Sequence, residues 1–171
     1  MKKLCPTYAE SSNYRGFTQN TRRMSSDDMD KLRVSVLERD KYKCSYCDFQ
    51  GGKWQTIGYL DGDSSNNKMS NLTTVCPMCN LILNTRLGCQ IESIVELYQS
   101  SRYDQNKIVQ MTRKLRSEGK TDAQIIQALG LRNKVPFKLN RKYLSGLFAF
   151  VTSWKGSYGD VEEALADCYG H

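Results

Sequence analysis

The chain has 171 residues, a formal charge of +7, 39% apolar residues and 10% aromatic residues. This composition is typical of a globular protein with one domain, or one small module plus an extension, and it excludes a disordered chain. No run approaches the roughly 18 consecutive apolar residues of a transmembrane helix, and the basic N-terminus lacks the apolar core of a secretory signal. We therefore expect a cytoplasmic protein without a membrane span.

Residues 1–24 are polar and irregular. They predict an arm that lies on the body of the protein, anchored by Tyr8, Tyr14 and Phe17, with a frayed tail as the alternative.

The first helix is expected to begin at Ser25. Asp28 follows three residues later, which is close to a capping box, and acidic residues fill the first turn, where the helix dipole favours them. Apolar residues then recur at helical spacing at Met29, Leu32 and Val36. The helix ends near Arg39 and leads directly into the motif Cys44-Ser-Tyr-Cys47.

Two short strands are expected at Trp54–Leu60 and Leu72–Val75, joined by a loop rich in Gly, Asp, Asn and Ser. A second motif, Cys76-Pro-Met-Cys79, follows, and a helix over Asn80–Leu87 is broken by Gly88. Residues 25–100 therefore predict a zinc-binding domain built on a ββα unit.

Residues 101–171 predict a helical C-terminal part packed on that domain. The apolar spacing favours five helices from residue 91 onward, the first of which lies at the end of the preceding domain. They are Ile91–Tyr98, a helix containing Ile108, Met111 and Leu115, a helix capped by Thr121, the long helix Phe137–Trp154, and Asp160–Cys168. Lys134-Val135-Pro136 is expected to be a connector, because proline disfavours helix in the residue before it. The predicted fold class is α+β, mainly helical.

The two Cys-x-x-Cys motifs are the most specific signal in the chain. A tight Cys-x-x-Cys turn presents two thiolates to one metal, and four thiolates fill the tetrahedral sphere of Zn²⁺. Cys44, Cys47, Cys76 and Cys79 therefore predict one structural Zn²⁺ ion without an open position for substrate. Redox-active cysteine pairs are the alternative. The remaining cysteines, Cys5, Cys89 and Cys168, are expected to be free thiols, because an odd total of seven argues against a disulfide framework.

The stretch from Leu37 to Asn80 resembles the zinc-bracketed HNH (ββα-metal) endonuclease family. The resemblance rests on the two Cys-x-x-Cys motifs, called knuckles below. It also rests on the residues Leu60-Asp61-Gly62-Asp63, Asn66-Asn67 and Asn71-Leu72 between them. It implies that Gly58 replaces the metal ligand, that Tyr59 replaces the histidine that deprotonates water, and that Asn80 replaces the histidine after the last cysteine.

These replacements predict a protein without nuclease activity. Glycine has no side chain to bind a metal, and a tyrosine with a usual pKa of about 10 is a poor base near neutral pH. The single histidine is His171. Asp61, Asp63, Asn66 and Asn80 could bind a hard cation, but in such a loop these residue types favour Asx turns. Asn71 is expected to fix the loop through bonds to the backbone.

The sequence Tyr59-Leu-Asp-Gly-Asp63 is similar to that of the DotN (IcmJ) family of type IVB secretion systems. This resemblance implies a catalytically inactive adaptor protein of the coupling complex, with structural zinc, that docks on the coupling ATPase. Residues 101–150 carry eleven Lys and Arg against three Asp and Glu, which suits an acidic partner segment.

A DNA-binding protein is the alternative function. Lys107–Gly130 has the pattern of the first two helices of a helix-turn-helix motif, and Phe137–Trp154 is the candidate third helix. That segment is apolar nearly all round, which favours a core or partner-binding helix instead. A residual metal-dependent HNH endonuclease is the other alternative.

Overall fold

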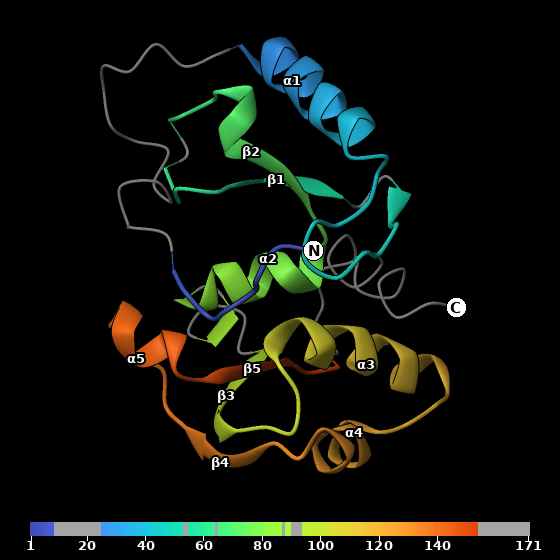
Figure 1. Ribbon diagram of the computed structural model, residues 1–171, viewed down its shortest axis with the longest axis vertical. Coiled ribbons are helices and arrows are strands. Elements are labelled where there is room, and N and C mark those ends of the chain that lie inside the picture. Colours follow the sequence, from blue (N-terminus) through green and yellow to red (C-terminus); the bar gives the residue numbers. More distant parts are fainter. Residues whose placement is uncertain (9–24, 53–54, 64, 87, 90–93, 154–171) are drawn as a thin grey trace.

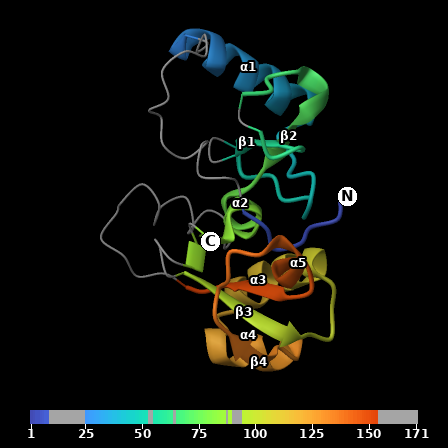
Figure 2. The same ribbon diagram turned by 90° about the vertical axis from the view of Figure 1, so that its left-hand side faces the viewer.

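The structure, a computed structural model, describes residues 1–8, 25–52, 55–63, 65–86, 88–89 and 94–153. One antiparallel sheet consists of β1 (Thr56–Tyr59) and β2 (Leu72–Val75). The other has the order β4-β3-β5, with β3 (Val95–Ser100) between β4 (Arg132–Val135) and β5 (Phe148–Val151). Both views place the short helix α2 (Pro77–Leu83) between the two sheets (Figure 1, Figure 2).

Helix α1 (Ser26–Arg39) begins as the sequence predicts and covers the two-stranded sheet. The Ser25 side chain accepts a hydrogen bond from the Asp28 amide. At the other end, the Arg39 guanidinium donates to the carbonyl of Leu72, and the Asp40 carboxylate accepts a bond from the Thr74 amide. These contacts fix the end of α1 to β2 just before the chain enters the first cysteine knuckle.

The predicted strand Leu72–Val75 is confirmed, and it pairs with β1 in the register Thr56↔Val75 to Tyr59↔Leu72. The helix expected from Asn80 begins three residues earlier, at Pro77. Proline is well suited to the first turn of a helix, where its missing N–H would have no partner. The early start places Cys79 in the first turn of α2.

The N-terminal segment 1–8 lies on the body as predicted, and its buried residues are Leu4 and Pro6. The Lys2 amide donates to the Ser45 carbonyl, and the Thr7 amide donates to the Ile82 carbonyl. Tyr8 is half-buried and packs against the core as expected. Tyr14 and Phe17 lie outside the described residues, as does the predicted helix over 160–168.

The second sheet overturns two predicted helices. Residues 95–98 belong to strand β3, and residues 137–154 contain the short helix α5 (Arg141–Ser145) followed by β5. Val95 and Leu97 face one core cluster while Tyr98 faces the other, so the sheet is buried on both faces. A strand buried on both sides reads as a continuous apolar run, which periodicity alone does not distinguish from a buried helix.

The expected connector at residues 134–136 is also corrected, since its first two residues belong to the edge strand β4. Proline at 136 follows the strand and marks its end. The fold is therefore α+β with two small antiparallel sheets, and residues 101–153 are less helical than the sequence predicts.

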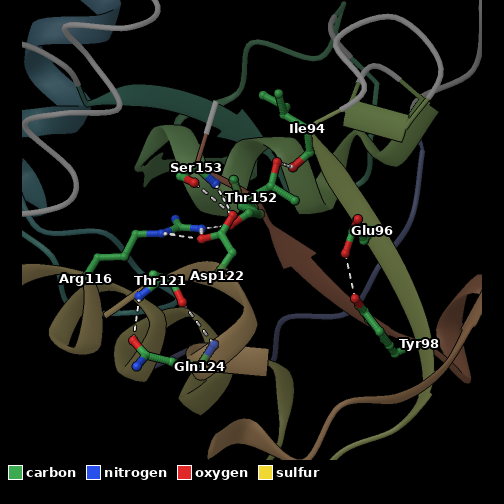
Figure 3. A network of polar contacts seen from close by, with 10 residues as sticks. Ile94, Glu96, Tyr98, Arg116, Thr121, Asp122, Gln124, Thr152 and Ser153 are labelled. Atoms are coloured by element: carbon green, nitrogen blue, oxygen red, sulfur yellow. Dashed lines mark hydrogen bonds and ion pairs between the residues drawn. The ribbon is translucent and has the colours of Figure 1, made fainter. Parts of the chain in front are cut away.

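Helices α3 (Gln105–Ser117) and α4 (Asp122–Leu129) are present as predicted, and α4 begins with a complete capping box between Thr121 and Gln124. Arg116 on α3 lies 2.7 Å from the Asp122 carboxylate, and its guanidinium also donates to the Val151 carbonyl (Figure 3). The second Asp122 oxygen accepts bonds from the amide and hydroxyl of Ser153. This network fastens both helices to the end of β5.

Candidate metal centre

Four cysteines from two distant parts of the chain meet in one cluster. Their Sγ atoms all lie within 4.8 Å of one another, and all four residues are buried. The four cysteines are Cys44, Cys47, Cys76 and Cys79. The two sequence motifs, 28 residues apart, are therefore brought to a single point, and the cluster could hold a metal ion.

The backbone around each knuckle accounts for this convergence. In the first knuckle, the Cys44 amide donates to the Phe49 carbonyl and the Asp48 amide donates to the Cys44 carbonyl, which closes a tight turn. The Ser45 amide then donates to the Thr74 carbonyl of β2. Because β2 runs directly into Cys76, this bond holds the first knuckle beside the second.

The cluster has the dimensions of a tetrahedral thiolate site. Zinc–sulfur bonds of about 2.3 Å in a tetrahedron place the sulfurs about 3.8 Å apart. The Sγ atoms of Cys47 and Cys76, one from each knuckle, are separated by 3.6 Å. Cysteine thiolate is a soft donor that suits zinc better than magnesium or calcium. The residues present therefore fit a tetrahedral, sulfur-bound ion, whose identity as Zn²⁺ stays a prediction.

The pKa values of the thiols differ across the cluster. A hydrogen bond with Cys44 lowers the pKa of Cys47, and the nearby positive charge of Arg113 acts in the same direction. Burial is the main cause that raises the pKa of Cys76. A bound cation would supply the charge that favours thiolate at every ligand, because metal ligation requires deprotonated sulfur.

Sequence reasoning missed one residue of this site, Arg113 on α3. Its guanidinium nitrogens lie 3.5 Å from the Cys47 Sγ and 3.4 Å from the Cys76 Sγ. The guanidinium carbon lies 3.8 Å from the centroid of the Phe49 ring. Arg113 follows the second knuckle by more than thirty residues, so neither motif nor spacing pointed to it.

The loop between the strands is held as the sequence predicts. The Asn71 side chain accepts a bond from the Asp61 amide and donates to the Asn66 carbonyl and the Asp61 carboxylate. The Asn66 side chain also donates to the Asp61 carboxylate, and Asp63 accepts bonds from Ser65. These hydrogen bonds fix the conformation of the loop, as Asx turns do.

Gly58 and Tyr59, the residues that replace catalytic groups in the resemblance, lie side by side on β1. A Cβ atom at Gly58 would lie 2.6 Å from the Cγ2 of Val75 on β2. Burial raises the pKa of Tyr59, and the charge of Asp63 raises it further; the hydroxyl donates to Asn67. Asn80, the third such position, lies on α2 and accepts a bond from the side chain of Asn84, the C-cap residue of that helix.

Two of the three other cysteines lie in the described part of the chain. Cys5 and Cys89 are free and half-buried, and burial raises the pKa of Cys89 to about 12. Cys168 lies outside the described residues. The expectation of free thiols is thus confirmed for Cys5 and Cys89. None of the helices in the described ranges is long and apolar enough to cross a membrane.

Comparison with known proteins finds a partial similarity to a type 4 apparatus protein. No protein-family model matches the chain. A stretch of 44 residues is 48% identical to the type 4 apparatus protein DotN of Legionella pneumophila subsp. pneumophila strain Philadelphia 1. The matched stretch covers 26% of this chain and 21% of that protein.

Proposed function

We propose that this chain is a catalytically inactive, zinc-stabilised adaptor of a type IVB secretion system, which acts in the cytoplasm and docks on the coupling ATPase. The observation that carries the proposal is the 48% identity over 44 residues to a protein named as a type 4 apparatus component. The HNH-like order of knuckle, strand, loop, strand and knuckle supports the same assignment, because it is the pattern on which the sequence resemblance rests.

The metal in this proposal is one structural Zn²⁺. Four buried cysteines occupy all positions of a tetrahedral ion, which leaves none for water or substrate. The test is metal analysis of the purified protein. We expect one zinc per chain, and loss of that zinc when Cys76 and Cys79 are both replaced by Ser. Zinc absent from the natural protein would contradict the assignment.

The surroundings of β1 support the proposed absence of nuclease activity. Hydrolysis of a phosphodiester by this route needs a metal to offset developing charge and a base to activate water. Val75 fills the space in which a ligand side chain at Gly58 would begin. Incubation with plasmid DNA and Mg²⁺ or Mn²⁺ should leave the DNA intact. Cleavage that is lost in Asp61→Ala would instead show that the loop retains activity.

The adaptor role is tested by co-purification with the coupling ATPase of the same secretion system. We expect a stable complex with the natural protein and with Asp61→Ala, since that loop has no part in the proposed role. The Cys76→Ser/Cys79→Ser variant should lose the complex, because its knuckles no longer close. Failure of the natural protein to co-purify would contradict the adaptor role while leaving the zinc assignment standing.

Only some of the basic residues in 101–150 are available to an acidic partner. Arg116 forms an ion pair with Asp122, and Lys134 forms one with Glu96, so these cations are engaged within the fold. Exposed cations outside these pairs remain on this part of the chain, among them Lys107, Lys120, Arg132 and Lys142. These side chains are the ones we assign to contact with an acidic segment.

The segment that would supply the recognition helix of the DNA-binding alternative does not form a long helix. The segment expected to supply it folds as the short helix α5, which has five residues, and the strand β5. A helix that reads the major groove needs several exposed side chains on one face. We therefore expect no salt-dependent shift of duplex DNA at protein concentrations that saturate the ATPase.

A further inference from the structure

Helix α3 faces the first cysteine knuckle with three polar side chains spaced one turn apart. The Asn106 amide donates to the Tyr46 carbonyl at 2.6 Å, and the Gln110 amide donates to the Cys47 carbonyl at 3.3 Å. Arg113 then reaches the sulfur atoms themselves. Positions separated by four and three residues lie on one face of a helix, so the stripe follows the knuckle from its backbone to its ligands.

Arg113 contacts both knuckles at once. One guanidinium nitrogen lies 3.5 Å from the Sγ of Cys47 and the other lies 3.4 Å from the Sγ of Cys76. The face of the same group stacks on Phe49, which follows the first knuckle, at 3.8 Å. A planar, rigid fork can make two parallel bonds and a stacking contact together, whereas a lysine ammonium cannot.

The net charge of the metal-bound cluster explains why a guanidinium beside the sulfur atoms is favourable. Four thiolates around one divalent cation carry a net charge of −2, and burying such a charge is costly unless a counter-charge lies nearby. Hydrogen bonds from groups outside the ligand set orient the ligands and tune how strongly they hold the metal. Arg113 supplies both the counter-charge and the hydrogen bonds, to one sulfur from each knuckle.

We propose that Arg113 is a positioning residue of the metal centre, which holds one thiolate of each knuckle and couples metal binding to the docking of α3. The proposal rests on the zinc site proposed above and adds a residue from the second half of the chain to it. The metal centre then joins the two-stranded unit to the helix that supports the second sheet.

The test compares three variants of the full-length protein. Arg113→Met removes the charge and the hydrogen bonds while keeping an unbranched side chain, and Arg113→Lys keeps the charge alone. Lys114→Met removes the same charge from the neighbouring position of α3, where the side chain is 75% exposed. Zinc affinity is measured by competition with a chromogenic chelator. The thiolate-to-metal charge-transfer band is measured after substitution with Co²⁺.

We expect zinc affinity to fall roughly 10- to 100-fold in Arg113→Met, as is typical when a partner of metal ligands is lost. Arg113→Lys should fall between that variant and the natural protein. Lys114→Met should stay within about twofold, because an exposed charge is screened by salt. The charge-transfer band should shift in both Arg113 variants, since hydrogen bonds to sulfur change its electron density. A role in packing alone would lower thermal stability without moving the band.

Natural affinity and an unshifted band in Arg113→Met would overturn the proposal. If Arg113→Met does not fold, Arg113→Lys decides the matter by the same two measurements, since it preserves the charge and most of the length. A natural protein that binds no zinc would refute the zinc site itself. A natural protein that binds one zinc, with Arg113 variants that bind it equally well, would refute only the role of Arg113.

Discussion

Gln105, at the start of α3, provides the sharpest test of how the second sheet is held. Its side-chain amide donates to the Ala149 carbonyl at 2.8 Å, and its side-chain oxygen accepts a bond from the Ala149 amide at 2.7 Å. Ala149 lies in β5, an edge strand of the sheet. Gln105 therefore occupies the place that a neighbouring strand would take, and we predict that Gln105→Leu strongly destabilises the protein.

The magnitude follows from burial. Gln105 is 4% exposed and Ala149 is fully buried, so water cannot replace the lost partners. Each buried polar group left without a hydrogen bond costs about 1–3 kcal/mol. Two such groups on Ala149 predict a loss of about 2–6 kcal/mol, against a total stability of about 5–15 kcal/mol for an ordinary domain. Leucine does not require the burial of an amide, which places the expected value in the lower half of that range.

The assay is urea denaturation of the purified protein, followed by circular dichroism. The midpoint should fall while the dependence on urea stays unchanged. The matched control is Gln127→Leu, at an exposed position of α4, where the stability should change by no more than about 0.5 kcal/mol. If Gln105→Leu also stayed within about 0.5 kcal/mol of the natural protein, the proposed role of this amide would be refuted.

Three further predictions concern the two-stranded sheet, the loop between its strands and the end of α1. Gly58→Ala should cost about 1–3 kcal/mol through overpacking against Val75, and less in a Val75→Ala background; additive costs in denaturation experiments would contradict the clash. Burial raises the pKa of Asp40, but hydrogen bonds from Arg39 and from the backbone outweigh it and leave the pKa lowered. The stability that Asp40 contributes should therefore be present above about pH 4 and be lost as the pH falls through the lowered value; unfolding titrations of Asp40→Asn should lack this acid-side loss. Asn71→Ala should speed hydrogen exchange of the Asp61 amide, which Asn71 binds, by about tenfold. This factor corresponds to the loss of a hydrogen bond worth about 1.4 kcal/mol. Unchanged exchange would show that the loop is held by other bonds.

The parts of the fold that the sequence predicted correctly depend on local signals. Ser25 caps α1 because its hydroxyl lies three residues before the amide that it binds. The strand Leu72–Val75 follows a loop in which Asp61 and Asp63 each accept a bond from the backbone amide two residues later. Both features involve contacts within a few residues of one another, so the pattern of residue types was sufficient.

The wrong helices have one shared physical cause. Residues Leu147 to Val151 are consecutively apolar because β5 has a core on each side: Ala149 and Val151 face the cluster that includes the cysteines, and Phe150 faces the cluster under α4. Gly146 separates α5 from this run and was the signal that could have ended the predicted helix. The burial of both faces depends on residues far away in the chain, so it was not visible in the local pattern.

The contacts of α3 with the metal centre were beyond any local pattern for the same reason. The sequence separation between Arg113 and Cys47 is 66 residues. Judged from the local sequence alone, the polar face of α3 formed by Asn106, Gln110 and Arg113 is that of an ordinary amphipathic helix. Such a face is usually exposed to water. Only the docking of that face on a knuckle turns its polar groups into partners for backbone carbonyls and sulfur.

The core makes the metal centre part of both halves of the protein. One continuous cluster of buried residues contains the four cysteines together with Leu97 of β3 and Val109 of α3. In a small independent zinc module, by contrast, the metal stabilises only the unit that carries its ligands. Since here the four cysteines, the second sheet and α3 share one core, the free energy of binding a metal at this cluster would be shared by the two-stranded unit and the part of the chain that carries the second sheet. The proposed adaptor would then present the surfaces of both parts in a fixed relation, and such preorganisation lowers the cost of binding one partner across them.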